Sequence, residues 1–144
     1  MKHQDGFPSD TVNLQWRKGR DFLLPDGMEF YWRGMRLRHK PGGHTDGTSF
    51  PAIVQVIPDA DQTGWTLQCG IAHDAAYHRD LERWSEAEQA WKPFHLEQEQ
   101  ADEMIRDLLF ATADTTERQL QVEPIYLALK KFGAKAYEEG AKRL

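Results

Sequence analysis

The segment from Gly70 to His78 carries the side chains best suited to chemistry. It places His73 beside Asp74 within an apolar run, and Tyr77 follows one helical turn after the histidine. Polar groups in an apolar environment cost free energy unless they are hydrogen-bonded or bind a ligand. A helix with this pattern therefore needs partners for its histidine and its carboxylate, and such clusters are typical of functional sites.

Neighbouring residues of a helix point about 100° apart, so His73 and Asp74 need separate partners. In one division of roles, His73 faces a second carboxylate that fixes its tautomer, and Asp74 binds a cation together with loop oxygens. That arrangement is hydrolytic, because the imidazole takes a proton from water and the metal stabilises the developing oxyanion. We expect Asp102, which lies next to apolar Ala101 on a later helix, to orient His73, and Tyr77 to hydrogen-bond Asp102.

A glycine-rich loop precedes the apolar run and holds Asp46 between glycines and hydroxyl residues. Oxygen-rich loops bind hard cations, so Asp46 and Asp74 are the candidate metal ligands. His39 and His44 are further candidates, although they come from different elements. The alternative for Asp46 is an Asx turn in which Gly47 supplies the positive φ.

A purely structural interpretation of the polar residues stays open. Asp74 could pair with His78, and Asp102 with Arg106, as ordinary i,i+4 helix pairs. A satisfied buried network can also specify a core without any chemistry.

The first third of the chain predicts β-structure. Asp21–Leu24 is a short apolar run, and Pro25 to Gly27 is a turn signal that makes Met28–Trp32 the return strand. After a second tight turn, Met35–His39 alternates apolar and basic residues, which is typical of a half-exposed strand. These three strands predict a meander that needs cover on one face. The segment Ile53 to Ile57 could be a short strand or a helical turn.

Helical periodicity dominates the rest of the sequence. The expected helical segments run from about 63 or 64 to 84, for one or two turns within 85–93, from about 96 to 112, from about 116 to 132, and over the terminal residues 134–144. Pro124 should kink or restart its helix, and Gly133 marks a stop.

The chain of 144 residues is long enough for one domain with a single core. The pattern predicts an α+β fold: a small N-terminal antiparallel β-meander, at about residues 20–57, packed on a bundle of about three to four helices, at about residues 63–144. The oligomeric state is left open.

Charge, hydropathy and cysteine content argue against nucleic-acid-binding, membrane-spanning and disulfide-bonded proteins. The net charge of −5 gives no general attraction to nucleic acid, and the basic stretch from Arg33 to Lys40 is interpreted as a solvated strand face. The sequence contains no run of about 18 apolar residues, so we expect no transmembrane segment. The single cysteine, Cys69, cannot form an intrachain disulfide and fits a reducing compartment. We expect it to be a core residue, the alternative being a nucleophile beside His73.

Four segments in this order resemble a phage- and prophage-associated family known as domain of unknown function 1353. They are Gly42–Pro51, Ala72–Tyr77, Gln100–Met104 and Tyr126–Gly133, and the resemblance covers roughly residues 20–133. The family pattern reads Gly-Phe-x-Thr-Asp-Gly-Ala-Ser-x-Pro, then His-Asp-x-x-Tyr, then Ala-Asp, then a helix ending in Phe-Gly. The chain departs from it at Gly43, where an aromatic residue is usual, and at Thr48, where alanine is usual.

The resemblance implies functional positions at Thr45, Asp46, Ser49, His73, Asp74, Tyr77 and Asp102. It also implies a phage protein that is made in the host cytoplasm and could be incorporated in the phage particle.

A looser similarity links the same order of elements to calcium-dependent phospholipases, both the secreted enzymes and the phospholipase domain of parvovirus capsids. It implies that His73 is the base, that Asp74 and the loop hold Ca²⁺, and that Tyr77 supports Asp102, which orients His73. The disulfides of the secreted enzymes are absent, as they are in the viral domain.

The leading hypothesis is therefore a phage-type, metal-assisted hydrolase of an ester or amide bond in cell-envelope lipid or peptidoglycan, with Ca²⁺ favoured over Zn²⁺. The second hypothesis is a non-enzymatic phage structural or tail-associated protein, whose partners are other phage proteins and whose polar cluster fixes the fold. A phosphohydrolase of the His-Asp metal class fits less well, because those sites take an upstream histidine from a helix, whereas His39 and His44 are expected on a strand and a loop.

Overall fold

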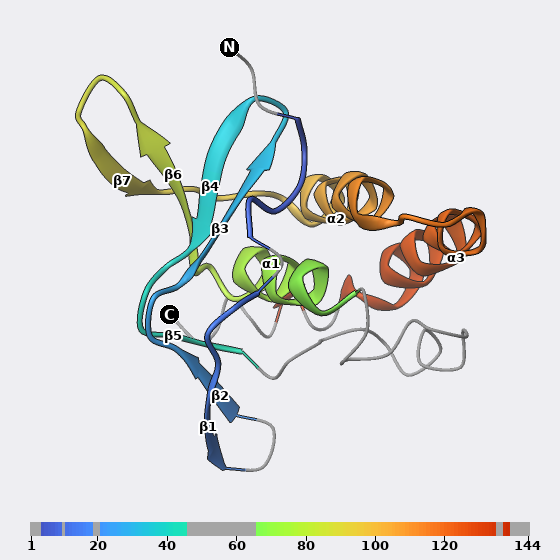
Figure 1. Ribbon diagram of the computed structural model, residues 1–144, viewed down its shortest axis with the longest axis horizontal. Coiled ribbons are helices and arrows are strands. Elements are labelled where there is room, and N and C mark those ends of the chain that lie inside the picture. The colour runs from blue at the N-terminus through green and yellow to red at the C-terminus, as the bar shows by residue number, and fades with distance from the viewer. Residues whose placement is uncertain (1–3, 10, 19–20, 46–65, 135–136, 139–144) are drawn as a thin grey trace.

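The computed structural model describes residues 4–9, 11–18, 21–45, 66–134 and 137–138. It has two antiparallel sheets and three helices, which confirms the predicted α+β class (Figure 1). The elements are β1 (Gln15–Lys18), β2 (Asp21–Leu24), β3 (Met28–Trp32), β4 (Met35–His39), β5 (Gly43–Thr45), α1 (Leu67–Tyr77), β6 (Leu81–Ser85), β7 (Ala90–Pro93), α2 (Gln98–Thr112) and α3 (Thr116–Phe132). Within these ranges, no helix is long and apolar enough to cross a membrane.

The strands divide between a small sheet, in the order β1-β2-β5, and a larger sheet, in the order β3-β4-β6-β7. The prediction that β3 is the return strand of β2 is therefore wrong. The turn is present, since the Gly27 N–H donates to the Leu24 carbonyl and Gly27 has a φ of 67°. This turn leads the chain from the small sheet to the larger one, because β2 pairs with β1 and β5. The mostly polar sequence of β1 gave no reason to expect a strand there.

The β3–β4 hairpin follows the alternation of its sequence. Met28, Phe30 and Trp32 are buried on one face, and Leu37 and His39 of β4 are buried with them. The turn residues Arg33 and Gly34 have φ values of 50° and 78°, the left-handed pair that closes tight hairpins.

The prediction of helix as far as residue 84, and of further helical turns within 85–93, is wrong. Helix α1 ends at Tyr77, Arg79 reverses the chain with a φ of 64°, and β6 and β7 form a second hairpin. Cross-strand contacts favour the hairpin: Trp84 and Trp91 pack edge to face with ring centroids 5.5 Å apart. Such pairs outweigh a local helical pattern, because strand stability depends on cross-strand neighbours.

The two later helices match the prediction closely. Helix α2 begins with a capping box formed by Glu97 and Gln100, and its predicted apolar stripe is buried. Helix α3 is capped by Thr115, which accepts a hydrogen bond from the Arg118 N–H, and it continues through Pro124. The predicted segment Ile53 to Ile57 and part of the predicted terminal helix lie outside the described residues.

Helix α1 lies at the centre of the molecule, between the sheets and α2 (Figure 1). Every residue from Cys69 to Tyr77 is buried. Helix α2 packs on α1, and α3 packs on α2. The candidate site residues of α1 therefore sit inside the core, not on a surface groove.

Candidate functional site

The polar candidates are among the most buried residues of the protein. His73, Asp74 and Asp102 are each at most 2% exposed. Burial of a carboxylate costs free energy unless the group is paired and hydrogen-bonded, so Asp74 and Asp102 must each have close partners. Those partners form two clusters on different sides of α1, as the 100° angle between adjacent helical residues requires.

The first cluster joins His73, Tyr77 and Asp102. Nε2 of His73 lies 3.4 Å from Oδ1 of Asp102, and the Tyr77 phenol donates to the same oxygen at 2.5 Å. The rings of His73 and Tyr77 stack with centroids 3.8 Å apart. Three side chains that the sequence analysis assigned to one site thus lie in direct contact.

The electrostatics of this cluster keep the phenol protonated. Burial raises the pKa of Tyr77 far above its ordinary value of 10.0, and the hydrogen bond to Asp102 raises this pKa further. Loss of the proton would place a phenolate against a carboxylate in a medium of low polarity. Tyr77 is therefore a permanent donor to Asp102 at neutral pH.

The second cluster surrounds Asp74. The Thr45 hydroxyl donates to Oδ2 of Asp74 at 2.7 Å, and Nε2 of His78 lies 3.6 Å from Oδ1. Thr45 reaches this carboxylate because β5 pairs with β2 beside α1. Of the two helix pairs considered from spacing, the one between Asp74 and His78 is present.

The other helix pair, Asp102 with Arg106, is wrong. The Arg106 guanidinium donates instead to Glu123 of α3, with Nε 2.6 Å from Oε1. The Asp102 carboxylate instead contacts His73 and Tyr77 of α1. This orientation follows from the apolar stripe of α2, which places Asp102 beside the buried Ala101.

His39, one of the two candidate histidines upstream of α1, has backbone partners of its own. His39 is fully buried, and its two ring nitrogens lie 3.1 and 3.3 Å from the carbonyl oxygens of Lys40 and His44. A Cβ at Gly43 would come within 2.2 Å of this ring. The imidazole of His39 thus occupies the space that a side chain at residue 43 would need.

Of the two predicted metal ligands, Asp74 belongs to the described residues, whereas Asp46 lies outside them, as does the predicted site residue Ser49. Within the residues that are described, no three histidine, cysteine, aspartate or glutamate side chains converge as a ligand set. Both oxygens of Asp74 already face Thr45 and His78, so this carboxylate does not by itself fit a cation site.

Cys69 is a core residue, as expected. It is fully buried, with its sulfur 3.6 Å from the Thr112 hydroxyl oxygen. Burial raises the pKa of the thiol from 9.0 to about 12. The thiolate that a nucleophile needs is therefore scarce at neutral pH, which argues against the alternative role.

Two residues that close over Tyr77, Gly133 and Tyr137, were not predicted to belong to the site. The ring of Tyr137 meets that of Tyr77 edge to face at 5.2 Å, and the Tyr137 hydroxyl donates to the Leu96 carbonyl. A Cβ at Gly133 would lie 2.6 Å from the Tyr77 hydroxyl oxygen. Gly133 itself could have pointed to a close contact, but it was interpreted as the residue that ends the preceding helix.

Comparison of the chain with protein family models, with curated proteins and with solved structures finds no match.

Proposed function

We propose that this protein is a small phage-type hydrolase in which His73 is the general base. The proposal depends on one oxygen atom that two side chains share. Oδ1 of Asp102 lies 3.4 Å from Nε2 of His73 and accepts a hydrogen bond from the Tyr77 phenol. A carboxylate at one ring nitrogen fixes the tautomer and orientation of an imidazole. The other nitrogen, Nδ1, would then take the proton of an attacking water.

The proposed reaction is the addition of water to the carbonyl carbon of an ester or amide. His73 takes a proton from water as the new C–O bond forms, and returns it to the oxygen or nitrogen that leaves. Asp102 holds the ring in place and balances its transient positive charge, while Tyr77 holds Asp102. The resemblance to a phage family supports an envelope substrate, either lipid or peptidoglycan, since a phage must breach that layer.

One observation favours a second candidate, a non-enzymatic phage structural or tail-associated protein. His73 is 1% exposed and Asp102 is 2% exposed, whereas a base has to meet water and substrate. In this second proposal the two polar clusters hold α1 against β5 and α2, and the partners are other phage proteins. A satisfied buried network can specify a single core arrangement in that way.

A divalent cation remains a separate proposal, with Ca²⁺ favoured and Zn²⁺ second. Because the described residues do not form its ligand set, binding would require Asp46 in addition to Asp74, and no step above depends on it. Calorimetric titration of chelator-treated protein with Ca²⁺, Zn²⁺ and Mg²⁺ tests this. Heat that Asp74→Asn removes supports a site at Asp74, and absence of heat from folded protein overturns it.

The variant His73→Ala separates the two functions. If the protein is a hydrolase, we expect His73→Ala to fold but to lose activity on purified bacterial envelopes, measured as released fatty acid or amine. The structural protein predicts no activity in either form and a loss of about 1–3 kcal/mol in the free energy of unfolding, because buried partners lose a contact. His95→Ala is the matched control, since His95 is exposed and lies outside both clusters, with its ring near Glu97 and Tyr137.

A further inference from the structure

The two hairpins of the larger sheet separate toward their tips. Strands β4 and β6 pair from His39 and Leu81 as far as Leu37 and Arg83. Beyond that point the β3–β4 and β6–β7 hairpins diverge, as Figure 1 shows. A cleft of about 690 Å³ lies between them, which is within the range of ligand sites.

Aromatic rings from both hairpins line this hairpin cleft. Tyr31, Trp84 and Phe94 are half-buried, one on each of two strands and one just after β7. Two of these rings make cation–π contacts: the Arg36 guanidinium lies 5.4 Å from the Trp84 ring, and that of Arg83 lies 5.8 Å from the Phe94 ring. Rings restrained by such contacts lose little freedom when a ligand stacks on them.

The charges at the hairpin cleft are largely compensated. Arg36 pairs with Glu29 at 2.8 Å, and Lys92 pairs with Glu88 at 2.6 Å. Arg83 is exposed, and no carboxylate within the described ranges lies at ion-pair distance from it. A polyanion needs a surplus of cations, which this balance does not supply.

The Trp84 indole also fixes an acceptor, because its N–H donates to Glu86 at 3.2 Å. The hairpin cleft thus offers half-exposed rings, one guanidinium donor and fixed polar groups without a strong field. This combination suits a neutral ligand that has apolar faces and many hydroxyl and amide groups. A sugar ring meets that description, because its C–H faces pack on aromatic rings while its rim hydrogen-bonds.

We propose that the hairpin cleft binds a neutral glycan of N-acetylated sugars, with Trp84 and Tyr31 against the sugar faces and Arg83 donating to an amide carbonyl or hydroxyl. The inference rests on the proposed function, since it names the glycan strands of the envelope as the part of the substrate that the protein grips. Binding needs no bond cleavage, so the two proposals fail separately. Glycan binding without hydrolysis would leave this one standing.

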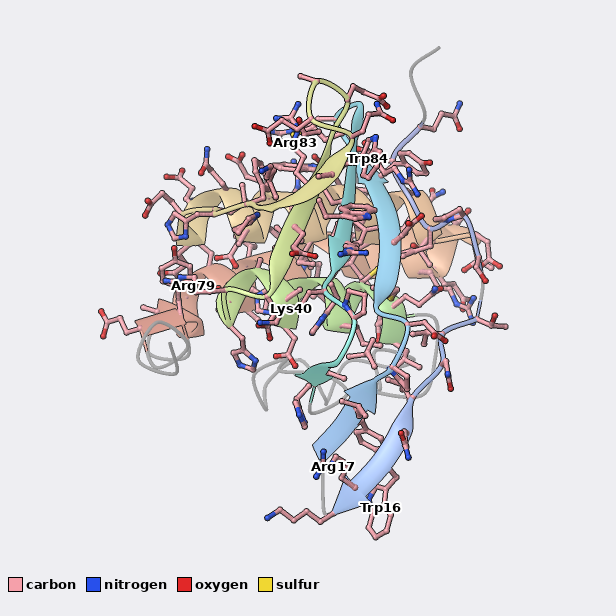
Figure 2. All side chains as sticks on the ribbon, turned by 90° about the vertical axis from the view of Figure 1, so that its left-hand side faces the viewer. Trp16, Arg17, Lys40, Arg79, Arg83 and Trp84 are labelled. Carbon is pink, nitrogen blue, oxygen red and sulfur yellow. The ribbon has the colours of Figure 1, made fainter. Side chains whose placement is uncertain are left out.

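The test is calorimetric titration of the full chain with an oligomer of N-acetylglucosamine. We expect saturable binding that changes little when NaCl is raised from about 50 to about 300 mM, because no ion pair with the ligand is screened. Arg83→Met keeps the apolar stem and removes the donors, so affinity should fall about tenfold. Arg17→Met is the control: Figure 2 shows Arg17 and Trp16 at the opposite end of the molecule from Arg83 and Trp84.

Trp84→Leu should abolish binding, with circular dichroism used to check that the hairpin persists. Three results would overturn the proposal: no binding by folded wild-type protein, equal affinities for Arg83→Met and Arg17→Met, or binding that high salt removes and single-stranded DNA displaces. The last result would indicate a site for polyanions.

Discussion

The phenol of Tyr77 donates a hydrogen bond to Oδ1 of Asp102 at 2.5 Å, and this contact joins α1 to α2 inside the core. The two residues are 25 positions apart in the chain and are at most 2% exposed. His73 approaches the same oxygen from the preceding turn of α1. The Asp102 carboxylate therefore joins two side chains of α1, whether the cluster performs chemistry or only fixes the packing of the two helices.

Replacement of Tyr77 by phenylalanine should weaken this link. Tyr77→Phe keeps the ring stacked on His73 but removes a donor from a buried carboxylate, so we expect the free energy of unfolding to fall by about 1–3 kcal/mol. Urea denaturation measures it. Tyr126→Phe is the control, because Tyr126 is half-buried on α3 and its ring lies beside the Arg106 guanidinium, away from Asp102. Equal stabilities of the two variants would show that the phenol contributes nothing.

The Thr45 hydroxyl should contribute comparably to the second cluster. Thr45→Val preserves the shape of the side chain and removes the donor to Asp74, so the thermal midpoint should fall. Thr45→Ser keeps the hydroxyl and should retain most of the stability. If valine and serine behave alike, the hydrogen bond between β5 and α1 is not what holds Asp74.

The buried thiol of Cys69 predicts alkaline instability. Its pKa is raised to about 12 in the folded protein, so the unfolded chain loses this proton first. The stabilising contribution is complete below the unfolded value of 9.0 and is lost as pH rises from there toward about 12. Urea unfolding at pH 8, 9 and 10 should therefore show a decline that is smaller in Cys69→Ala. A decline of the same size in both proteins would contradict this assignment.

A side chain at residue 133 should disturb the cluster around Asp102 by crowding Tyr77. Gly133 has an ordinary φ of −83°, so alanine causes no backbone strain, but its Cβ would crowd the Leu129 carbonyl and the Tyr77 hydroxyl. We expect Gly133→Ala to destabilise the protein by about 1–3 kcal/mol through overpacking. Leu127→Ala, at an exposed position of the same helix, should change stability by no more than about 0.5 kcal/mol. Calorimetric unfolding compares the two, and similar losses would refute the close contact.

The sequence predicted the helices and strands whose signals are local. The bounds of α3 follow from a threonine cap and a terminal glycine. The tight turn at Arg33 and Gly34, together with the alternation of Met35–His39, predicted the first hairpin of the larger sheet. The same approach failed at β6 and β7. Their residues have helical spacing, and their strand structure comes from cross-strand pairs such as Arg38 with Glu82 and Trp84 with Trp91. Only the folded chain brings these pairs together.

The candidate site shows a similar division. Helical spacing placed His73 and Tyr77 on one side of α1 and suggested Asp102 as their partner, and these three residues do meet. Spacing could not decide whether Asp102 faces α1 or Arg106, because both fit the pattern. Helical spacing also could not show that Gly133 and Tyr137 close over Tyr77. These two residues follow α3, and spacing within one helix does not say where residues outside it lie relative to α1.

The most direct test of the proposed hydrolase is the initial rate at which Asp102→Asn releases fatty acid or amine from purified bacterial envelopes, compared with the wild type. Asparagine has nearly the same shape and keeps an acceptor for Tyr77, but its amide no longer fixes His73 in the basic tautomer. We expect release by the wild type and a rate about 10²–10⁴-fold lower in the variant, whose unfolding midpoint should be unchanged. No release by the wild type, or equal rates in both proteins, would contradict the proposal.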